Sequence, residues 1–162
     1  MRFLSTIFAF FVFFAGTVYA ECKLQLPDSP SLANIRLGMT VDQANAALGG
    51  KPKLKSKGER RTNYFRFKQG KAKGPISGAK AFWVRFYQGR VYSVEIFYHS
   101  GYGDLEGLIE TYASRNGFDV SLFETKHGYS RAKCDGFSVE ADLILNPHLE
   151  LIDTNVKELL DK

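Results

Sequence analysis

Two acidic side chains near the C-terminus have a spacing that could support acid–base chemistry. Glu140 and Asp142 lie two residues apart in an alternating segment, so a strand would place both carboxylates on one face. Paired carboxylates are used in hydrolysis, but acids on an exposed strand are more often only solvated. No nucleophile elbow, metal-ligand pair or phosphate loop accompanies the three histidines of the chain. We therefore expect no enzymatic activity, no metal and no cofactor, with a hydrolase as the minor alternative.

Aromatic and arginine side chains alternate in the middle of the chain and could form a binding surface. In residues 81–88 a strand would place Trp83, Arg85 and Tyr87 opposite the apolar set, and residues 64–68 and 90–98 alternate similarly. Tryptophan, tyrosine and arginine dominate interface hot spots because each combines a large contact area with a directed polar group. If the apolar sets face the helices, the other face displays the predicted binding residues Tyr64, Arg66, Trp83, Arg85, Tyr87 and Phe97.

A purely structural role for these side chains is the competing interpretation. Aromatic residues and arginines on a solvated sheet face often stabilise cross-strand pairs, and Arg85 could simply pair with Glu95. A C-terminal helix could also cover the face. The sequence leaves open whether the face is exposed, and it does not identify the partner or the oligomeric state.

Positive charge is concentrated in one segment of the chain. The net charge is +5, but residues 51–80 contain eleven Lys or Arg residues and a single acid. The alternative function is therefore binding of an anionic envelope surface, such as lipid headgroups or lipopolysaccharide, through the basic segment 51–73. Nucleic acid is not expected, because no recognised binding motif is present. The cations predicted to bind the anion are Lys51, Lys53, Lys55, Lys57, Arg60 and Arg61.

The N-terminus has the features of a secretory signal. A basic start precedes an apolar run over residues 3–16, and residues 18–20 supply the small-x-small pattern of a cleavage site. The apolar run is shorter than a membrane-spanning helix requires. We therefore predict a signal peptide over residues 1–20 and one exported domain over residues 21–162, located in the periplasm or secreted and not spanning a membrane.

The two cysteines of the chain, Cys22 and Cys134, are expected to form a disulfide in such a compartment. It would tie the mature N-terminus to a late strand. A lipid anchor on Cys22 is the less favoured alternative, because Glu21 precedes the cysteine where lipoproteins have a small residue. Zinc is less favoured still, because neither cysteine has a second ligand at the usual spacing.

The elements that must position these residues follow from hydrophobic periodicity. We predict helices at residues 40–48, 104–116 and 156–160, and strands at 64–68, 81–88, 90–98, 120–125, 129–133 and 137–143, with an edge strand at 149–152. The helix ends follow from a capping box of Thr40 with Gln43, an N-cap at Asp104 and a stop at Gly117, and residues 88–89 predict a tight turn. Hydrophobic residues make up 44% of the chain and aromatic residues 14%, enough for one core. The expected fold class is α+β: a curved antiparallel sheet with two helices packed on one face, in an approximately doubled helix-plus-three-strand unit.

Residues 35–50 carry a family resemblance. An Ile-Arg-Leu-Gly-Met-Thr opening precedes a helix that contains Gln-Ala and ends in Leu-Gly. This segment resembles the start of the small β-barrel-assembly lipoproteins and is similar to the β-lactamase inhibitory proteins, which repeat a helix-plus-sheet unit twice. The resemblance implies a non-catalytic, inhibitor-like module that binds another exported or envelope protein through a sheet face or its loops. The chain departs from the lipoproteins by lacking a lipidation box and by being longer.

Overall fold

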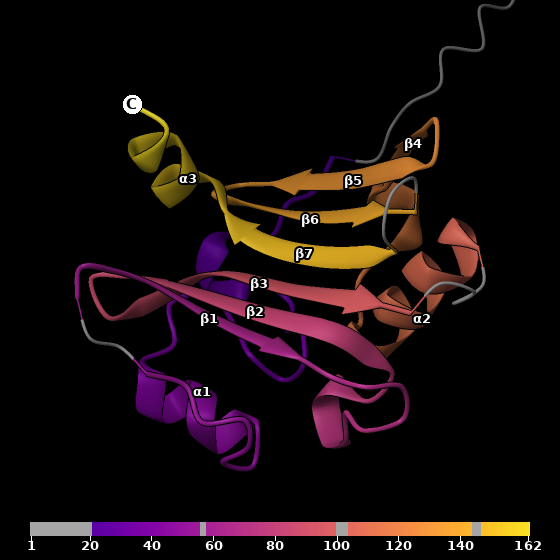
Figure 1. The fold of residues 1–162 in the computed structure, drawn as a ribbon. Helices are drawn as coiled ribbons and strands as arrows, with labels where there is room; N and C mark the ends of the chain where they lie inside the picture. Colours follow the sequence, from indigo (N-terminus) through magenta and orange to yellow (C-terminus); the bar gives the residue numbers. More distant parts are fainter. Residues whose placement is uncertain (1–20, 56–57, 100–103, 144–146) are drawn as a thin grey trace, which may run out of the picture.

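Three α-helices and one seven-stranded sheet make up the secondary structure of the residues that the computed structural model describes, 21–55, 58–99, 104–143 and 147–162 (Figure 1). The predicted signal peptide and Lys57 lie outside these residues. The sheet is antiparallel throughout, so the predicted α+β class is confirmed. The elements are α1 (Val41–Ala47), β1 (Arg60–Arg66), β2 (Ala79–Tyr87), β3 (Arg90–Tyr98), α2 (Leu105–Asn116), β4 (Glu124–Lys126), β5 (Tyr129–Cys134), β6 (Phe137–Asp142), β7 (His148–Asp153) and α3 (Thr154–Leu160).

The strand order, β1-β2-β3-β7-β6-β5-β4, joins two halves of the chain side by side. One half is α1 followed by three strands, and the other is α2 followed by four. The last strand was predicted to lie at an edge, and this is wrong: β7 pairs with both β3 and β6 at the centre of the sheet. Its burial agrees with a central position, because Leu149 and Leu151 are at most 2% exposed.

Local sequence signals determine where α1 begins and where α2 begins and ends. The hydroxyl of Thr40 accepts a hydrogen bond from the Gln43 backbone N–H at 3.3 Å, and the Gln43 side chain accepts one from the Thr40 N–H at 2.9 Å. This capping box starts α1. Asp104 caps α2 through the Gly107 N–H at 2.6 Å, and Gly117 ends it with a φ of 62°.

One face of the sheet forms the hydrophobic core. Phe82, Val84 and Phe86 of β2 are at most 1% exposed, and they belong to the same cluster as Val94 and Leu151 of the neighbouring strands. Buried residues of α1 and α2 join this cluster. In Figure 1 the indigo N-terminal segment runs behind the strands. That α1 and α2 both pack on this one face stays a prediction.

A β-bulge in β3 changes the face of one residue. The register passes from Arg85 opposite Ser93 to Phe86 opposite Val91, which leaves Tyr92 as the extra residue. Simple alternation along residues 90–98 would place Tyr92 on the apolar side with Val94 and Ile96. Partial burial raises the pKa of its phenol, and Arg85 and Glu150 are among its charged neighbours. Tyr92 therefore departs from the simple alternation of β3 and lies near Arg85 and Glu150.

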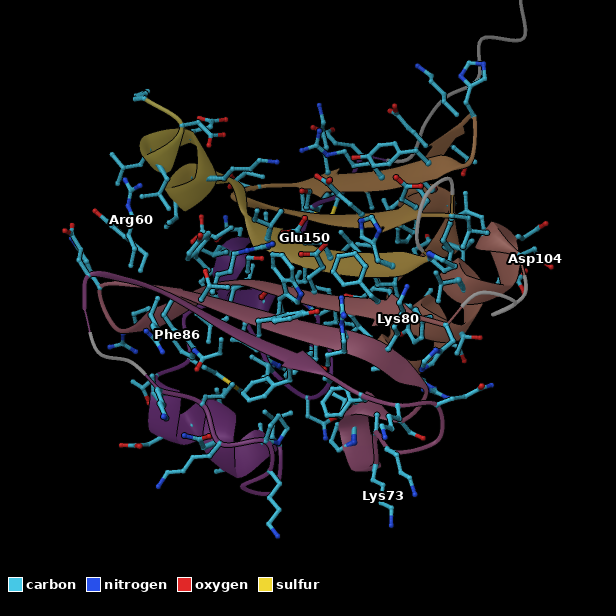
Figure 2. All side chains as sticks on the ribbon, in the orientation of Figure 1. Arg60, Lys73, Lys80, Phe86, Asp104 and Glu150 are labelled. Carbon is cyan, nitrogen blue, oxygen red and sulfur yellow. A yellow bond between two sulfur atoms is a disulfide. The ribbon has the colours of Figure 1, made fainter. Side chains whose placement is uncertain are left out.

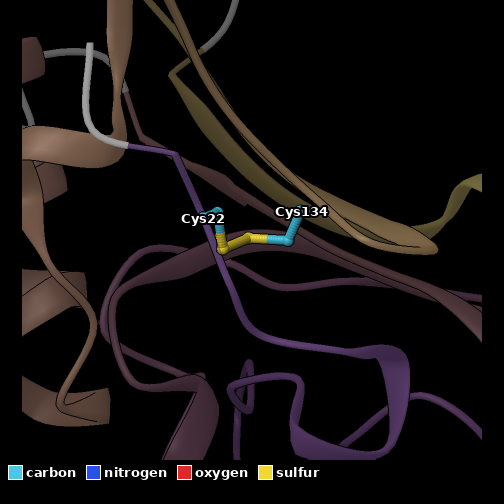
Figure 3. Close-up of a disulfide and its surroundings, with 2 residues drawn as sticks. All are labelled: Cys22 and Cys134. Atoms are coloured by element: carbon cyan, nitrogen blue, oxygen red, sulfur yellow. A yellow bond between two sulfur atoms is a disulfide. The ribbon is translucent and has the colours of Figure 1, made fainter. Parts of the chain in front are cut away.

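The predicted disulfide between Cys22 and Cys134 is present (Figure 3). It fixes the start of the described chain against the β5–β6 turn, where the Asp135 N–H also donates to the Leu24 carbonyl at 3.2 Å. A structural disulfide suits an oxidising compartment outside the cytoplasm. Among the described residues, no helix has both the length and the apolar character needed to cross a membrane.

Candidate binding site on the polar sheet face

The side chains opposite the core include two rows that cross all seven strands, and a third row beside them contains Arg85 and Ser93. In an antiparallel sheet, residues directly opposite one another point to the same face, so the register defines each row. One row contains Tyr64, Trp83, Glu95, Glu150, Glu140, Arg131 and Glu124. The adjacent row contains Arg66, Ala81, Phe97, His148, Asp142, Tyr129 and Lys126.

This polar face is open in the described part of the chain. Figure 1 views the sheet from this side, and no helix crosses in front of β2, β3 or β7. The C-terminal helix α3 lies at one end of the strands and not over this face (Figure 1). Figure 2 shows Glu150 near the middle of the face. The face is therefore available as a surface.

Arg85 is the centre of an ionic cluster on this face. Its guanidinium lies 2.7 Å from Oε2 of Glu95 and 2.9 Å from Oε1 of Glu150, and it also donates to the Ser93 hydroxyl at 2.8 Å. The Arg85–Glu95 pair that the competing structural interpretation allowed is therefore present. Burial, and secondly the charge of Glu150, raise the pKa of Glu95, while Arg85 opposes the increase. The arginine therefore keeps two adjacent carboxylates together in a partly buried place.

The acids that could have acted as a catalytic pair also have partners. Glu140 and Asp142 share the polar face, as the alternation predicts. Oε1 of Glu140 lies 3.0 Å from Nε of Arg131 and accepts a hydrogen bond from the Ser138 hydroxyl at 3.1 Å. Burial, and secondly a hydrogen bond with Glu140, raise the pKa of Tyr129 to about 12. No group of three potential metal ligands occurs among the described residues.

Aromatic rings form a continuous row beside the ionic cluster. The ring centroids of Tyr64 and Trp83 lie 5.2 Å apart in an edge-on arrangement, and those of Trp83 and Phe97 lie 5.8 Å apart. The row ends at His148, 5.0 Å from Phe97. The Arg85 guanidinium lies 4.8 Å from the centre of the Trp83 ring, a cation–π distance. The ionic cluster therefore also fixes the orientation of the indole.

A hollow of about 170 Å³ opens between these rings. It forms because Ala81 ends at Cβ, while its neighbours carry long side chains. Its lining residues are Tyr64, Arg66, Lys80, Ala81, Trp83 and Phe97. Tyr64 is 46% exposed, and its hydroxyl accepts a hydrogen bond from Nε of Arg66 at 3.0 Å. Within the described residues Arg66 has no carboxylate partner.

The structure brings most of the predicted binding residues together. Four of the six line the hollow, and Arg85 stacks on the hollow's Trp83 wall. Tyr87 lies further along β2, where its hydroxyl accepts a hydrogen bond from Gln88 at 3.2 Å. Ala81 and Lys80 were not predicted. The only sequence signal for Ala81 is that it is a small residue in a strand rich in aromatic residues. This signal becomes informative once the strand register is known.

Two asparagine side chains bind the backbone of the cationic segment at Leu54 and Lys55. Leu54 is 2% exposed. Oδ1 of Asn45 accepts a hydrogen bond from the Leu54 N–H at 2.7 Å, and Nδ2 of Asn45 donates one to the Leu54 carbonyl at 3.2 Å. The side-chain amide of Asn63 likewise accepts a hydrogen bond from the Lys55 N–H and donates one to the Lys55 carbonyl, each at 2.9 Å. Lys51, Lys53 and Lys55 are exposed, whereas Arg60 and Arg61, consecutive in β1, point to opposite faces. Arg60 and Arg61 therefore do not share one face of β1, and the anion site stays a prediction.

No family model, curated protein or solved structure matches this chain. The resemblance of residues 35–50 consequently stays a prediction. The sequence did not reveal two features, the hollow over Ala81, which depends on the pairing of β1, β2 and β3, and the asparagine clamps of Asn45 on Leu54 and Asn63 on Lys55. Asn45 stands among the alanines of α1 and Asn63 follows Arg60, Arg61 and Thr62 in β1, and neither position carries a sequence signal for the clamp.

Proposed function

We propose that this chain is a non-catalytic binding module that docks another exported protein on its polar sheet face. The single observation that carries the proposal is the hollow over Ala81, with three aromatic walls and two cations at its margin. Aromatic residues and arginine are the types enriched in interface hot spots. The doubled order of helices and strands supports the same inhibitor-like architecture that the resemblance of residues 35–50 implies.

The chemistry of the hollow defines what the partner must present. An engineered apolar cavity of ~150 Å³ holds one benzene ring, so a hollow of about 170 Å³ has room for one ring or one branched apolar side chain. Arg66 lacks a carboxylate partner in the described structure and lies at the margin. The partner residue that fits is therefore an aromatic or aliphatic side chain with an acidic neighbour.

Arg85 has a supporting role in this proposal. Its guanidinium already makes three hydrogen bonds within the chain, so engaging it from outside would break the pairing of two carboxylates. Its contact with Trp83 orients one wall of the hollow. We therefore regard Arg85 as a positioning residue, and Trp83 with Tyr64 as the residues that contact the partner.

The test is quantitative capture from envelope extract on immobilised residues 21–162, at low and moderate salt. Trp83→Ala removes a wall, and Ala81→Leu fills the hollow while leaving every wall in place. Both should reduce retention of the partner by roughly thirtyfold, which corresponds to a hot-spot loss of about 2 kcal/mol. Tyr129→Phe, at the other end of the same face, is the matched control and should retain the partner. Retention that survives both changes would refute the proposal.

The second candidate is binding of an anionic envelope surface through Lys51, Lys53 and Lys55. It is favoured by the clamping of this segment by Asn45 and Asn63, which presents the three lysines on a fixed backbone. Such binding weakens steeply with salt because exposed charges are screened within about 8 Å at physiological ionic strength. A partner lost with salt or with a Lys-to-Gln triple variant, and kept by Ala81→Leu, would favour this second function.

A further inference from the structure

The two edges of the sheet differ in length. At one edge β4 has three residues, whereas at the other edge β1 has seven and pairs only with β2 (Figure 1). An edge strand presents a row of backbone N–H and C=O groups that no neighbouring strand has bonded, and this row can pair with another chain. Strand β1 is therefore the longer template on which a further strand could add.

The register of β1 with β2 defines which backbone groups of β1 face outward. The Phe67 N–H donates to the Lys80 carbonyl at 2.8 Å, and the Gln88 N–H donates to the Glu59 carbonyl at 2.8 Å. Hydrogen-bonded pairs recur at every second residue of an antiparallel ladder, so the odd-numbered residues of β1 direct their backbone groups toward β2. The even-numbered residues direct theirs outward, and no other described segment forms a backbone hydrogen bond with them. These outward-facing residues are Arg60, Thr62, Tyr64 and Arg66.

This edge is accessible in the described structure, because all four outward-facing residues are exposed. Lys55 contacts β1 through hydrogen bonds with the side chain of Asn63. Asn63 lies opposite Val84 on the core side of the sheet and is an odd-numbered residue, whose backbone faces β2. The contact with Lys55 therefore leaves the outward N–H and C=O groups of β1 available to another chain.

The charge of β1 restricts what can pair with it. The strand contains three arginines and no acid, and no carboxylate among the described residues pairs with Arg60 or Arg66. If a second copy added in the antiparallel register that pairs all four outward-facing residues, Arg60 would lie opposite Arg66. Like charges directly opposite one another destabilise a sheet, whereas opposite charges stabilise it. Charge complementarity therefore favours an acidic strand over a second copy.

We propose that β1 binds an extended acidic segment of a partner protein as an additional antiparallel strand of the sheet. The backbone of the partner bonds the outward N–H and C=O groups, and acidic side chains at the two ends of its segment pair with Arg60 and Arg66. In such strand addition the backbone bonds supply affinity and the side chains supply specificity. This inference goes beyond the proposed function, because it uses the edge of the sheet and requires neither Ala81 nor Trp83.

The probe is the acetylated and amidated peptide Glu-Thr-Thr-Val-Thr-Thr-Glu, titrated into residues 21–162 and followed by amide chemical shifts. Its two glutamates match the spacing of Arg60 and Arg66, so its odd-numbered residues lie opposite the outward-facing ones. We expect saturable binding with a Kd of about 0.1–1 mM, and the largest shifts at the Thr62 and Tyr64 amides. The same peptide with lysine in place of both glutamates should bind at least about tenfold more weakly.

Methylation of the peptide backbone tests the pairing in the unmodified protein. The N–H groups of the third and fifth peptide residues donate to β1 in the proposed register, so methylating both nitrogens should weaken binding at least about tenfold. The N–H groups of the second and sixth residues point away from β1. Methylating these two nitrogens is the matched control and should change the affinity by less than about twofold.

Variants of the protein separate backbone pairing from charge attraction. Thr62→Pro removes one outward N–H but no hydrogen bond to β2, and it should weaken peptide binding by about tenfold; Thr62→Val keeps the N–H and is its control. Replacing Arg60 and Arg66 by glutamine should also weaken binding by about tenfold and remove its dependence on salt. Trp83→Ala should keep the peptide, so failure of the hollow as a docking site would not be mistaken for failure at this edge.

Three results would overturn the proposal. The first is the absence of saturable binding of the glutamate peptide to the unmodified protein. The second is an equal loss of affinity for the two methylated peptides, which would show that charge attraction holds the peptide without strand pairing. The third is a dimer of the peptide-free protein, measured by sedimentation, that Thr62→Pro dissociates, since a second copy would then occupy the edge.

Discussion

Replacing Arg85 with methionine tests how the polar face is held together. The substitution keeps the apolar stem but removes a guanidinium that makes hydrogen bonds with Glu95, Glu150 and Ser93. Removing one partner from a buried ion pair costs about 3–5 kcal/mol, because the other charge is left unpaired. The Arg85 side chain is 21% exposed, and those of Glu95 and Glu150 are 8% and 14% exposed, so water offsets part of this cost. We expect a loss of about 2–3 kcal/mol in the free energy of unfolding at pH 7.

The same variant makes a signed prediction about pH. Burial and Glu150 already hold the folded-state pKa of Glu95 above 4.5, and the loss of Arg85 raises it further. Below pH 4.5 this carboxyl is protonated in both the folded and the unfolded chain, so its charge costs nothing. As the pH rises above 4.5, the unfolded chain ionises first and folding stability decreases until the folded-state pKa is passed. The deficit of Arg85→Met relative to the unmodified protein should therefore be largest at neutral pH and shrink in acid.

Urea unfolding at pH 4 and pH 7 measures both effects. Adding Glu95→Gln to Arg85→Met should recover about half of the loss at pH 7, because it removes one of the two uncompensated charges. Arg66→Met is the matched control: this arginine is on the same face without a described carboxylate partner, and its loss should cost under about 0.5 kcal/mol. A cost for Arg85→Met no larger than that of Arg66→Met, or one independent of pH, would refute the proposed cluster.

Two further predictions concern the disulfide and two turn glycines. Both are tested by the free energy of unfolding measured in urea. Replacing Cys22 and Cys134 by serine opens a loop of 112 residues and should cost about 4–5 kcal/mol in the chain-entropy model; a cost under 1 kcal/mol would contradict this prediction. Gly136→Ala should cost about 2 kcal/mol or more, since φ is 78° and the added Cβ would lie 3.0 Å from Nδ2 of Asn155. Gly89→Ala, with φ 75° and no atom within 4 Å of its added Cβ, should cost about 1 kcal/mol, and equal costs at the two glycines would exclude the steric contribution.

The features that the sequence predicted well are those decided by near neighbours. The capping box of Thr40 and Gln43, the Asp104 cap and the Gly117 stop each involve residues within a few positions of one another. The β2–β3 turn at Gln88–Gly89 is likewise local, and both residues adopt the positive φ that a tight hairpin requires. Alternation then assigned the polar and apolar sides of the strands, because a strand reverses its side chains at every residue.

The features that the sequence could not supply depend on which strands lie beside each other. Nothing in residues 149–152 distinguishes an edge strand from a central one, because the pairing of β7 with β3 joins segments far apart in the chain. The bulge at Tyr92 shifts the alternation by one residue, and no local signal marks it. The hollow exists only because Ala81 lies opposite both Arg66 and Phe97, a coincidence of three strands.

The distribution of paired charge explains why binding should be confined to one half of the polar face. On the β5–β7 half, a partner would have to break the pairing of Glu140 with Arg131 or of Glu150 with Arg85, and each exchange leaves a partly buried charge without its partner. At the hollow over Ala81, a partner would meet aromatic rings and Arg66, an arginine without a described carboxylate partner, so contact there would require no such exchange. If the polar face binds a partner as proposed, the ion pairs that stabilise the sheet would therefore direct that partner toward Tyr64 and Trp83, which is why Tyr129→Phe is a suitable control for Trp83→Ala.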